Sequence, residues 1–268
     1  MSLPIIDPHM HMVSRSTSDY ERARLSGIEC CIEPAFWSGT DKQHAESFFD
    51  YFEQIIDFET ERAQRAAGVD HYVTIALEPK EANYPEMADR VMDRIPEYLD
   101  RDNVVGVGEI GLDQGTEAEE RAFRRQLRMA EERKLPVIVH TPHTNKPEGT
   151  KRLVELIQEE DVTEERIIID HNTENTIDIS LQTDCWVGFT LYPGKVDAET
   201  TIDLLAEYGT EKMLLNSAAD WDPSDPLAVP KARDKMLDRG WDRDEVRQVV
   251  FENPYEFFSQ SPNFEYEL

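Results

Sequence analysis

Two histidines near the start of the chain are the first residues whose type and spacing point to chemistry. His9 and His11 end the segment Ile-Ile-Asp-Pro-His-Met-His, which begins with the apolar residues Ile5 and Ile6. Side chains at positions i and i+2 of a strand point to the same side, so the two imidazoles face one space. Neutral imidazoles placed in this way can bind a divalent transition metal. The pair alone is equally consistent with a solvated strand edge.

Later segments also place an acid or a histidine at or just beyond the end of a short apolar run. These residues are Glu109, His140, His171 and Asp220. In a barrel of parallel strands, the carboxyl ends of the strands converge on one pocket. We therefore predict a site for one or two divalent metal ions. Zn²⁺ suits the histidines best, whereas Mn²⁺ or Mg²⁺ suits a site that is richer in carboxylates.

The elements that must position these residues are short apolar runs that alternate with helical patterns. Eight runs are expected as strands: Ile5–Ile6, Glu29–Ile32, Tyr72–Leu77, Val104–Val107, Val137–Val139, Ile167–Ile169, Trp186–Leu191 and Met213–Leu215. Several are apolar throughout, as in strands that are buried on both faces. Eight strand–helix units predict a single-domain (β/α)₈ barrel over residues 1–268. An open doubly wound sheet would instead call for a glycine-rich phosphate turn after the first strand.

Helical spacing is clearest between the second and third runs, where Phe48, Phe52 and Ile55 repeat at intervals of three and four residues. Thr116 and Glu119 have the spacing of a capping box at the start of another helix. These patterns place amphipathic helices between the strands, as the barrel requires.

The charge balance is the most unusual feature of the composition. The chain has 56 Asp and Glu against 28 Lys and Arg, for a net charge of −28. Acids spread along the whole chain predict adaptation to high salt, where a Debye length of about 3 Å at 1 M screens their repulsion. The same charge argues against a nucleic-acid-binding surface in dilute buffer.

Location is predicted from the apolar runs, the N-terminus and the cysteines. No apolar run is long enough for a membrane-spanning helix, and the N-terminus lacks the pattern of a secretion signal. Three cysteines, two of them the neighbours Cys30 and Cys31, make no disulfide framework. We therefore expect a cytoplasmic protein, whose oligomeric state the sequence leaves unknown.

Taken together, these segments resemble the TatD-related metal-dependent hydrolases of the amidohydrolase superfamily. The matching stretches run in order through nearly the whole chain: Asp7-Pro-His9-Met-His11, Val107-Gly-Glu109-Ile-Gly-Leu112, Pro136-Val-Ile-Val-His140-Thr141, Ile169-Asp-His171, Pro193-Gly-Lys195, Leu215-Asn-Ser217, Ser224-Asp-Pro-Leu-Ala-Val-Pro-Lys231 and Val250-Phe-Glu-Asn253-Pro254. The resemblance implies a hydrolase that activates a water with bound metal. It implies a phosphodiesterase or DNase-like activity on a small-molecule or nucleic-acid-fragment substrate.

The resemblance also implies roles for particular residues. His9 and His11 would hold a first metal together with Glu109, which bridges or joins it. His140 and His171 would hold a second metal. Asp220 would complete the first site and accept a proton from the attacking water.

The last strand departs from the family pattern. An alignment to the family puts the acid of this strand at Ala218, two residues before Asp220. Asp220 regains the same side only if the backbone after Ser217 stays extended or bulges. This departure leaves two alternatives open: a single-metal lactonase or amidase, and a barrel that binds a metabolite without turnover.

Basic and aromatic residues near the strand ends are candidates for substrate contacts. The predicted substrate-binding residues are His143, Asn145, Lys146 and Lys195. The alternative is that each lysine caps a helix or pairs with one of the many carboxylates. Phe36, Trp37 and Trp221 also flank strand ends, where two placements are open: they line the mouth of the pocket, or they pack against loops, which is the more common case.

Overall fold

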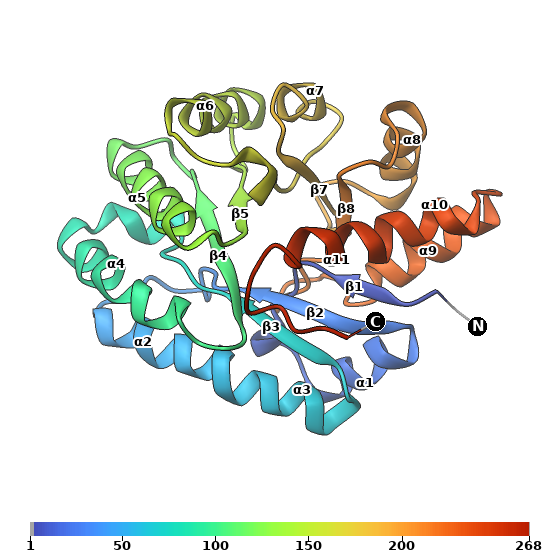
Figure 1. Ribbon diagram of the computed structural model, residues 1–268, viewed down its shortest axis with the longest axis horizontal. Coiled ribbons are helices and arrows are strands. Elements are labelled where there is room, and N and C mark those ends of the chain that lie inside the picture. The colour runs from blue at the N-terminus through green and yellow to red at the C-terminus, as the bar shows by residue number, and fades with distance from the viewer. Residues whose placement is uncertain (1–2, 268) are drawn as a thin grey trace.

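One barrel of parallel strands organises the molecule (Figure 1). The computed structural model describes residues 3–267. The strands are β1 (Ile5–Asp7), β2 (Ile28–Pro34), β3 (Asp70–Thr74), β4 (Val104–Gly111), β5 (Val137–His140), β6 (Ile167–Ile169), β7 (Trp186–Thr190) and β8 (Met213–Asn216). Each strand pairs in parallel with the next one along the chain. The predicted (β/α)₈ architecture is confirmed, and each predicted strand overlaps an observed one.

The helices surround the strands in Figure 1. They are α1 (Thr17–Leu25), α2 (Ala45–Glu53), α3 (Thr60–Ala67), α4 (Pro85–Leu99), α5 (Glu117–Arg133), α6 (Lys146–Glu159), α7 (Ile177–Ser180), α8 (Ala198–Tyr208), α9 (Ala228–Asp238), α10 (Arg243–Arg247) and α11 (Asn253–Phe258). Short 3₁₀ turns lie at Met12–Ser14, Pro79–Asn83 and Glu164–Arg166, and π-helical turns at Gln54–Glu59 and Gln248–Glu252. No helix within residues 3–267 is long and apolar enough to cross a membrane.

The barrel interior is filled by apolar side chains from strands on opposite sides. Val105 of β4, Ile138 of β5 and Ile168 of β6 belong to the same buried cluster as Ile5 of β1 and Leu214 of β8. Strands that are not neighbours can share such a cluster only across the interior. This packing holds the strand ends at fixed positions, which the site above them requires.

Backbone hydrogen bonds join the first and last strands just beyond their ends. The amide of Ala218 donates to the carbonyl of His9 at 2.8 Å, and the amide of His11 donates to the carbonyl of Ala219 at 2.9 Å. The Ser217 amide donates to Asp7 Oδ1 at 3.3 Å. The two histidines of the first strand therefore lie on the seam where the barrel closes.

Two local predictions differ in detail from the structure. The helix predicted around Phe48 and Ile55 continues through a π-helical turn into α3, an irregularity that the apolar spacing did not reveal. Thr116 caps α5 by accepting the Glu119 amide, but the Glu119 carboxylate does not return to Thr116. It accepts the amides of residues 113–115 instead, because the loop after β4 curls over it.

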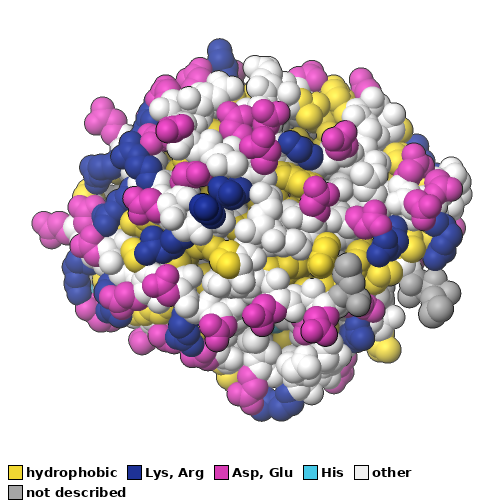
Figure 2. Space-filling view, in the orientation of Figure 1, with side chains coloured by type: hydrophobic (Ala, Val, Ile, Leu, Met, Phe, Trp, Pro, Cys, Tyr) yellow, Lys and Arg dark blue, Asp and Glu magenta, His cyan; other side chains and the backbone are white. Residues whose placement is uncertain are grey.

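On the face shown in Figure 2, the acidic residues are spread out rather than gathered in one patch. Many arginines lie among them in ion pairs, such as Arg152 with Glu120 and Arg239 with Asp203. Exposed pairs of this kind contribute little stability individually. The excess of acid remains a property of the whole surface.

Candidate metal centre

The predicted ligands come together at the carboxyl ends of the strands. His9 and His11 follow β1, Glu109 lies within β4, His140 ends β5, and His171 follows β6. All five side chains are buried. They form two triangles of donor atoms that share the carboxylate of Glu109.

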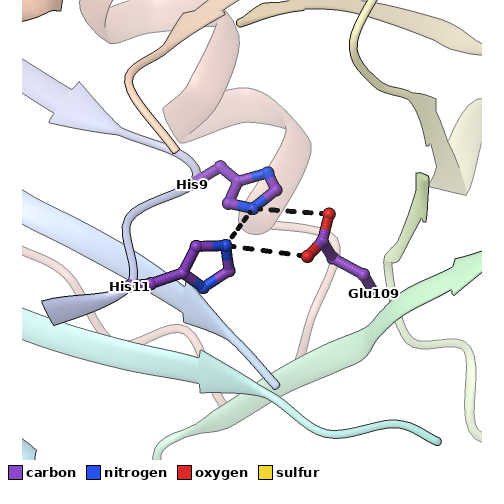
Figure 3. A group of neighbouring side chains, drawn as sticks. All are labelled: His9, His11 and Glu109. Carbon is purple, nitrogen blue, oxygen red and sulfur yellow. Dashed lines mark hydrogen bonds and ion pairs between the residues drawn. The ribbon is translucent and has the colours of Figure 1, made fainter. Parts of the chain in front are cut away.

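The first triangle joins His9, His11 and Glu109, whose side chains point toward one another in Figure 3. The Nε2 atoms of the two histidines are 3.0 Å apart. His9 Nε2 is 3.5 Å from Glu109 Oε1, and His11 Nε2 is 3.6 Å from Glu109 Oε2. A tetrahedral ion with bonds of 2.0–2.2 Å separates its ligand atoms by about 3.4 Å, so this spacing fits one ion.

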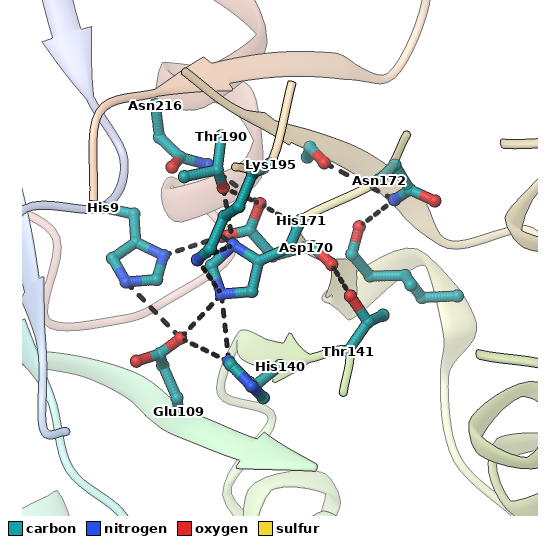
Figure 4. Close-up of polar contacts among 12 residues, drawn as sticks. His9, Glu109, His140, Thr141, Asp170, His171, Asn172, Thr190, Lys195 and Asn216 are labelled. Atoms are coloured by element: carbon teal, nitrogen blue, oxygen red, sulfur yellow. Dashed lines mark hydrogen bonds and ion pairs between the residues drawn. The ribbon is translucent and has the colours of Figure 1, made fainter. Parts of the chain in front are cut away.

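The second triangle joins Glu109, His140 and His171 (Figure 4). Glu109 Oε1 is 3.4 Å from His140 Nδ1 and 3.2 Å from His171 Nε2. The two imidazole nitrogens are 3.0 Å apart. The donor set therefore fits a second divalent ion, with Glu109 in position to bridge the two.

Contacts among the buried side chains shift the pKa values of Glu109 and His9. Burial alone would raise the pKa of Glu109, but the charge of His9 and hydrogen bonds from the surrounding imidazoles hold it well below its usual range. Burial likewise opposes the charged form of His9, yet Glu109 and Asp170 raise its pKa to about 9. These contacts therefore favour the ionised form of Glu109 and the protonated form of His9. A metal ligated by His9 would replace that proton.

Asp170 is a central residue that the sequence analysis did not single out. Its Oδ2 lies 2.7 Å from His9 Nδ1, and its Oδ1 accepts the backbone amide of His171 at 2.7 Å. Oδ1 also accepts Asn216 Nδ2 at 2.9 Å and the Thr190 hydroxyl at 3.3 Å (Figure 4). A carboxylate bonded to the distal nitrogen of a metal-binding imidazole fixes its tautomer and orientation. Asp170 therefore orients His9 and ties the loop of His171 to the same network.

The backbone around Asp170 is shaped for this contact. His171 has a φ of 61°, a conformation that costs energy for a residue with a side chain. A Cβ atom at Gly188 would lie 2.2 Å from Asp170 Oδ1, so β7 needs a glycine there. The turn at His171 explains why two adjacent residues, which would point to opposite sides of a regular strand, serve the same centre.

Asp220 lies apart from the donor triangles. Ala218 has a φ of 40°, so the backbone turns after β8 instead of staying extended. Oδ1 of Asp220 accepts the Tyr192 hydroxyl at 3.0 Å, the Asp222 amide at 2.9 Å and the Ser224 hydroxyl at 3.2 Å. Within residues 3–267, Asp220 belongs to no group of potential metal ligands, and its role as a ligand stays a prediction. It does line the cavity above the centre.

That cavity has a volume of about 340 Å³ and contains two of the four residues predicted to bind substrate. Lys195 and His143 line it, and Lys195 Nζ lies 3.1–3.2 Å from the ring nitrogens of His171. The ammonium of Lys146 donates instead to the Thr141 hydroxyl at 2.7 Å. Asn145 precedes the first residue of α6, and neither it nor Lys146 is among the lining residues.

Aromatic residues and a buried acid complete the cavity wall. Phe36, Trp37 and Trp221 line it, which is the first of the two placements expected for them. Glu78, just beyond β3, also lines the cavity, and burial raises its pKa to about 8. The sequence carried a signal for it, because Glu78 directly follows the run Tyr72–Leu77 that was expected as a strand.

Comparison with known proteins places this geometry in a family. The family model described as TatD related DNase matches residues 6–259. The chain belongs to the TatD-related family. A protein of Methanocaldococcus jannaschii, described as an uncharacterized metal-dependent hydrolase, is 31% identical over 255 residues, covering 95% of this chain and 99% of that protein. The sequence-based prediction of a metal-dependent hydrolase is confirmed at this level.

Solved structures agree with the TatD-related fold. The crystal structure of a TatD-like protein from Archaeoglobus fulgidus has a TM-score of 0.78 and 27% identity, covering 95% of this chain and 99% of that one. A phosphotriesterase homology protein from Escherichia coli has a TM-score of 0.68 at 16% identity, covering 96% and 99%. The second likeness shows the shared fold alone.

The contacts of Asp170 predict a loss of metal affinity when its charge is removed. We expect Asp170→Asn to weaken Zn²⁺ binding about 10- to 100-fold, because His9 loses the carboxylate that orients it and raises its basicity. Competition with a chromophoric chelator measures the dissociation constant. Asp184→Asn, which changes an exposed aspartate, is the matched control. An affinity equal to that of the wild type, in a variant with an unchanged melting temperature, would contradict the assignment.

The buried carboxyl of Glu78 predicts a pH-dependent stability. Its folded pKa lies above the usual value of 4.5 for a glutamic acid, so the protonated form favours the folded state and this contribution is lost as pH rises toward about 8. We expect the free energy of unfolding of the wild type to fall relative to that of Glu78→Gln between pH 5 and 8 or so, by at most about 1.4 kcal/mol per pH unit. Urea unfolding at several pH values measures it. Parallel curves for the wild type and Glu78→Gln would refute the argument, and the exposed control Glu86→Gln should run parallel.

Proposed function

We propose that the chain hydrolyses a phosphoester bond in a small-molecule or nucleic-acid-fragment substrate, using two divalent ions. The observation that carries the proposal is the pair of donor triangles that share Glu109. Divalent ions bound there would supply a water of lowered pKa and would polarise the scissile group. Zn²⁺ is the ion that we propose, since four of the five donors are imidazoles.

The side chains around the centre have separate proposed roles in binding the ions and the substrate. His9, His11, His140 and His171 hold the ions, and Glu109 joins the two sites. Lys195 lies beside His171 in the cavity and would bind an anionic oxygen of the substrate, with His143 lining the same wall. The contacts of Lys146 with Thr141 favour a structural role for that lysine. We propose none for Asn145 beyond its place at the start of α6.

Asp220 is the proton acceptor that we propose. The hydrogen bonds recorded for its carboxylate all reach Oδ1, so Oδ2 has none within residues 3–267. A carboxylate fixed through one oxygen and open at the other suits a general base. Its position at the cavity supports this role more strongly than the metal-binding role that the sequence suggested.

The setting that we propose is a salt-rich, reducing cytoplasm. Cys30, Cys31 and Cys185 are all free and buried, which supports a compartment without disulfide formation. The net charge of −28 and the spread of acids over the surface support adaptation to high salt. Oligomeric state is left open.

The function is tested by metal loading and turnover together. We expect the wild type to retain two equivalents of Zn²⁺ by elemental analysis and to hydrolyse bis(p-nitrophenyl) phosphate faster than a lactone or an anilide. Glu109→Gln should lose both metal and activity, whereas the control His44→Ala, which alters a residue outside the centre, should keep both. Preferred turnover of the lactone or the anilide would replace the phosphoester assignment.

The proton acceptor is tested in the same assay. Asp220→Asn should bind two ions but lower kcat by about 10²–10⁴-fold, the usual contribution of general acid–base catalysis. Asp222→Asn, at an exposed neighbour, is the control. Full activity of Asp220→Asn would show that another group takes the proton, and loss of one metal equivalent would restore its role as a ligand.

Salt dependence of stability is a separate prediction. We expect the melting temperature to rise from dilute buffer to about 1 M KCl, because added ions screen repulsion among surface carboxylates. An equally viscous sucrose solution controls for effects other than charge. An unchanged melting temperature in KCl would remove the proposal of salt adaptation.

A further inference from the structure

The mouth of the cavity combines an exposed aromatic face with unpaired cations. Phe36, Trp37, Tyr192 and Trp221 all line the cavity. Lys80 and Lys195 line it as well. We propose that this wall is a subsite for a planar ring carried by the substrate next to its phosphate. The proposal rests on the phosphoester hydrolysis proposed above and names the substrate class: small aromatic phosphate esters.

The aromatic wall begins directly at the metal centre. The ring of Phe36 stacks on His11 with centroids 3.7 Å apart and an interplanar angle of 11°. Trp221 follows at 5.1 Å from Phe36, tilted by 31°. The wall therefore extends from the predicted ligand His11 through Phe36 to Trp221.

Trp221 provides the face that remains open. It is 43% exposed, and among the exposed large apolar residues in the described part of the chain it is the one that lines this cavity. One face of Phe36 is covered by His11, and the ammonium of Lys80 lies 4.5 Å from the ring centroid of Trp37. An exposed tryptophan at the rim of a buried polar site is a suitable stacking partner for a planar ligand.

The cations identify the second half of the ligand. The lysine–carboxylate pairs within residues 3–267 involve Lys42, Lys231 and Lys235, not Lys80 or Lys195. No carboxylate within the described residues forms an ion pair with either of these two cavity lysines. A phosphate group of the substrate would form ion pairs with both lysines. The acids at the same rim, Asp220 and Asp222, oppose additional negative charge, which favours a singly phosphorylated ligand.

The cavity volume sets the size of that ligand. About 340 Å³ lies at the lower end of the range for small-molecule pockets. A cavity of this size suits a phosphate with a small ring system better than a base-paired duplex. We therefore assign the subsite to single aromatic rings of small molecules.

Binding of phosphonates, which cannot be hydrolysed as esters, tests the subsite without turnover. Calorimetry on the zinc-loaded protein should give tighter binding for phenylphosphonate than for methylphosphonate, with cyclohexylphosphonate as the apolar but non-planar control. Trp221→Ala should weaken phenylphosphonate about 5- to 100-fold, the range for loss of one aromatic stacking contact, and change methylphosphonate about twofold or less. Trp221→Phe should recover part of the affinity. Quenching of indole fluorescence by phenylphosphonate should disappear in Trp221→Ala.

Several results would overturn the subsite. Equal affinity for the phenyl and methyl ligands, equal affinity for the phenyl and cyclohexyl ligands, or an equal loss for all ligands in Trp221→Ala would each do so. These outcomes are distinct from failure of the proposed function. If phenylphosphonate binds selectively but no phosphoester is hydrolysed, the subsite stands and the proposed reaction is rejected. If phosphoesters are hydrolysed without any preference for a ring, the reaction stands and the subsite is rejected.

Discussion

A buried carboxylate surrounded by imidazoles is the interaction on which the centre depends. An ionised carboxylate cannot be removed from water without compensating partners. Glu109 meets this requirement with His9, His11, His140 and His171, all with a nitrogen within 3.6 Å of one of its oxygens. Because these histidines come from three separate strands, the partners are present only when the whole barrel is in register. The fold and the electrostatics of the centre therefore stabilise each other.

Around that carboxylate, buried side chains support the centre from below, whereas residues of the loops line the cavity above it. Asp170 and Asn216 form a fully buried hydrogen-bonded layer beneath the centre. Above it, residues from the loops after the strands line the cavity, including Trp221 and Lys195. This arrangement is typical of barrels of this kind, in which strand ends fix the reacting groups and loops set the substrate.

The sequence predicted those parts that depend on periodicity and on strand ends. The eight strands and the convergence of His9, Glu109 and His171 follow from apolar runs and the geometry of parallel sheets. The roles of residues set by local backbone turns were not predictable in this way. Asp170 shares the centre with its neighbour through the left-handed conformation of His171, and Asp220 is carried away from the ligands by that of Ala218. Neither conformation has a signal in residue type, because neither position is a glycine.

The wall of the cavity could not be settled from the sequence for a different reason. Trp221 and Glu78 are a tryptophan and an acid near strand ends, and such residues more often pack on loops or face solvent. Only the distances across the barrel distinguish these possibilities. Burial of Glu78 and exposure of Trp221 are both opposite to what their types would suggest, and both occur at the same cavity.

The seam between β1 and β8 has a consequence for how the protein matures. The hydrogen bonds between Ala218 and His9 and between His11 and Ala219 attach the earliest ligand segment of the chain to one of the last strands to be synthesised. A nascent chain that does not yet extend to residue 219 lacks the hydrogen bonds that hold the backbone of His9 and His11. The donor arrangement that would fit an ion at that triangle is therefore complete only once the last strand is in place, and a product truncated before residue 219 would lack these hydrogen bonds.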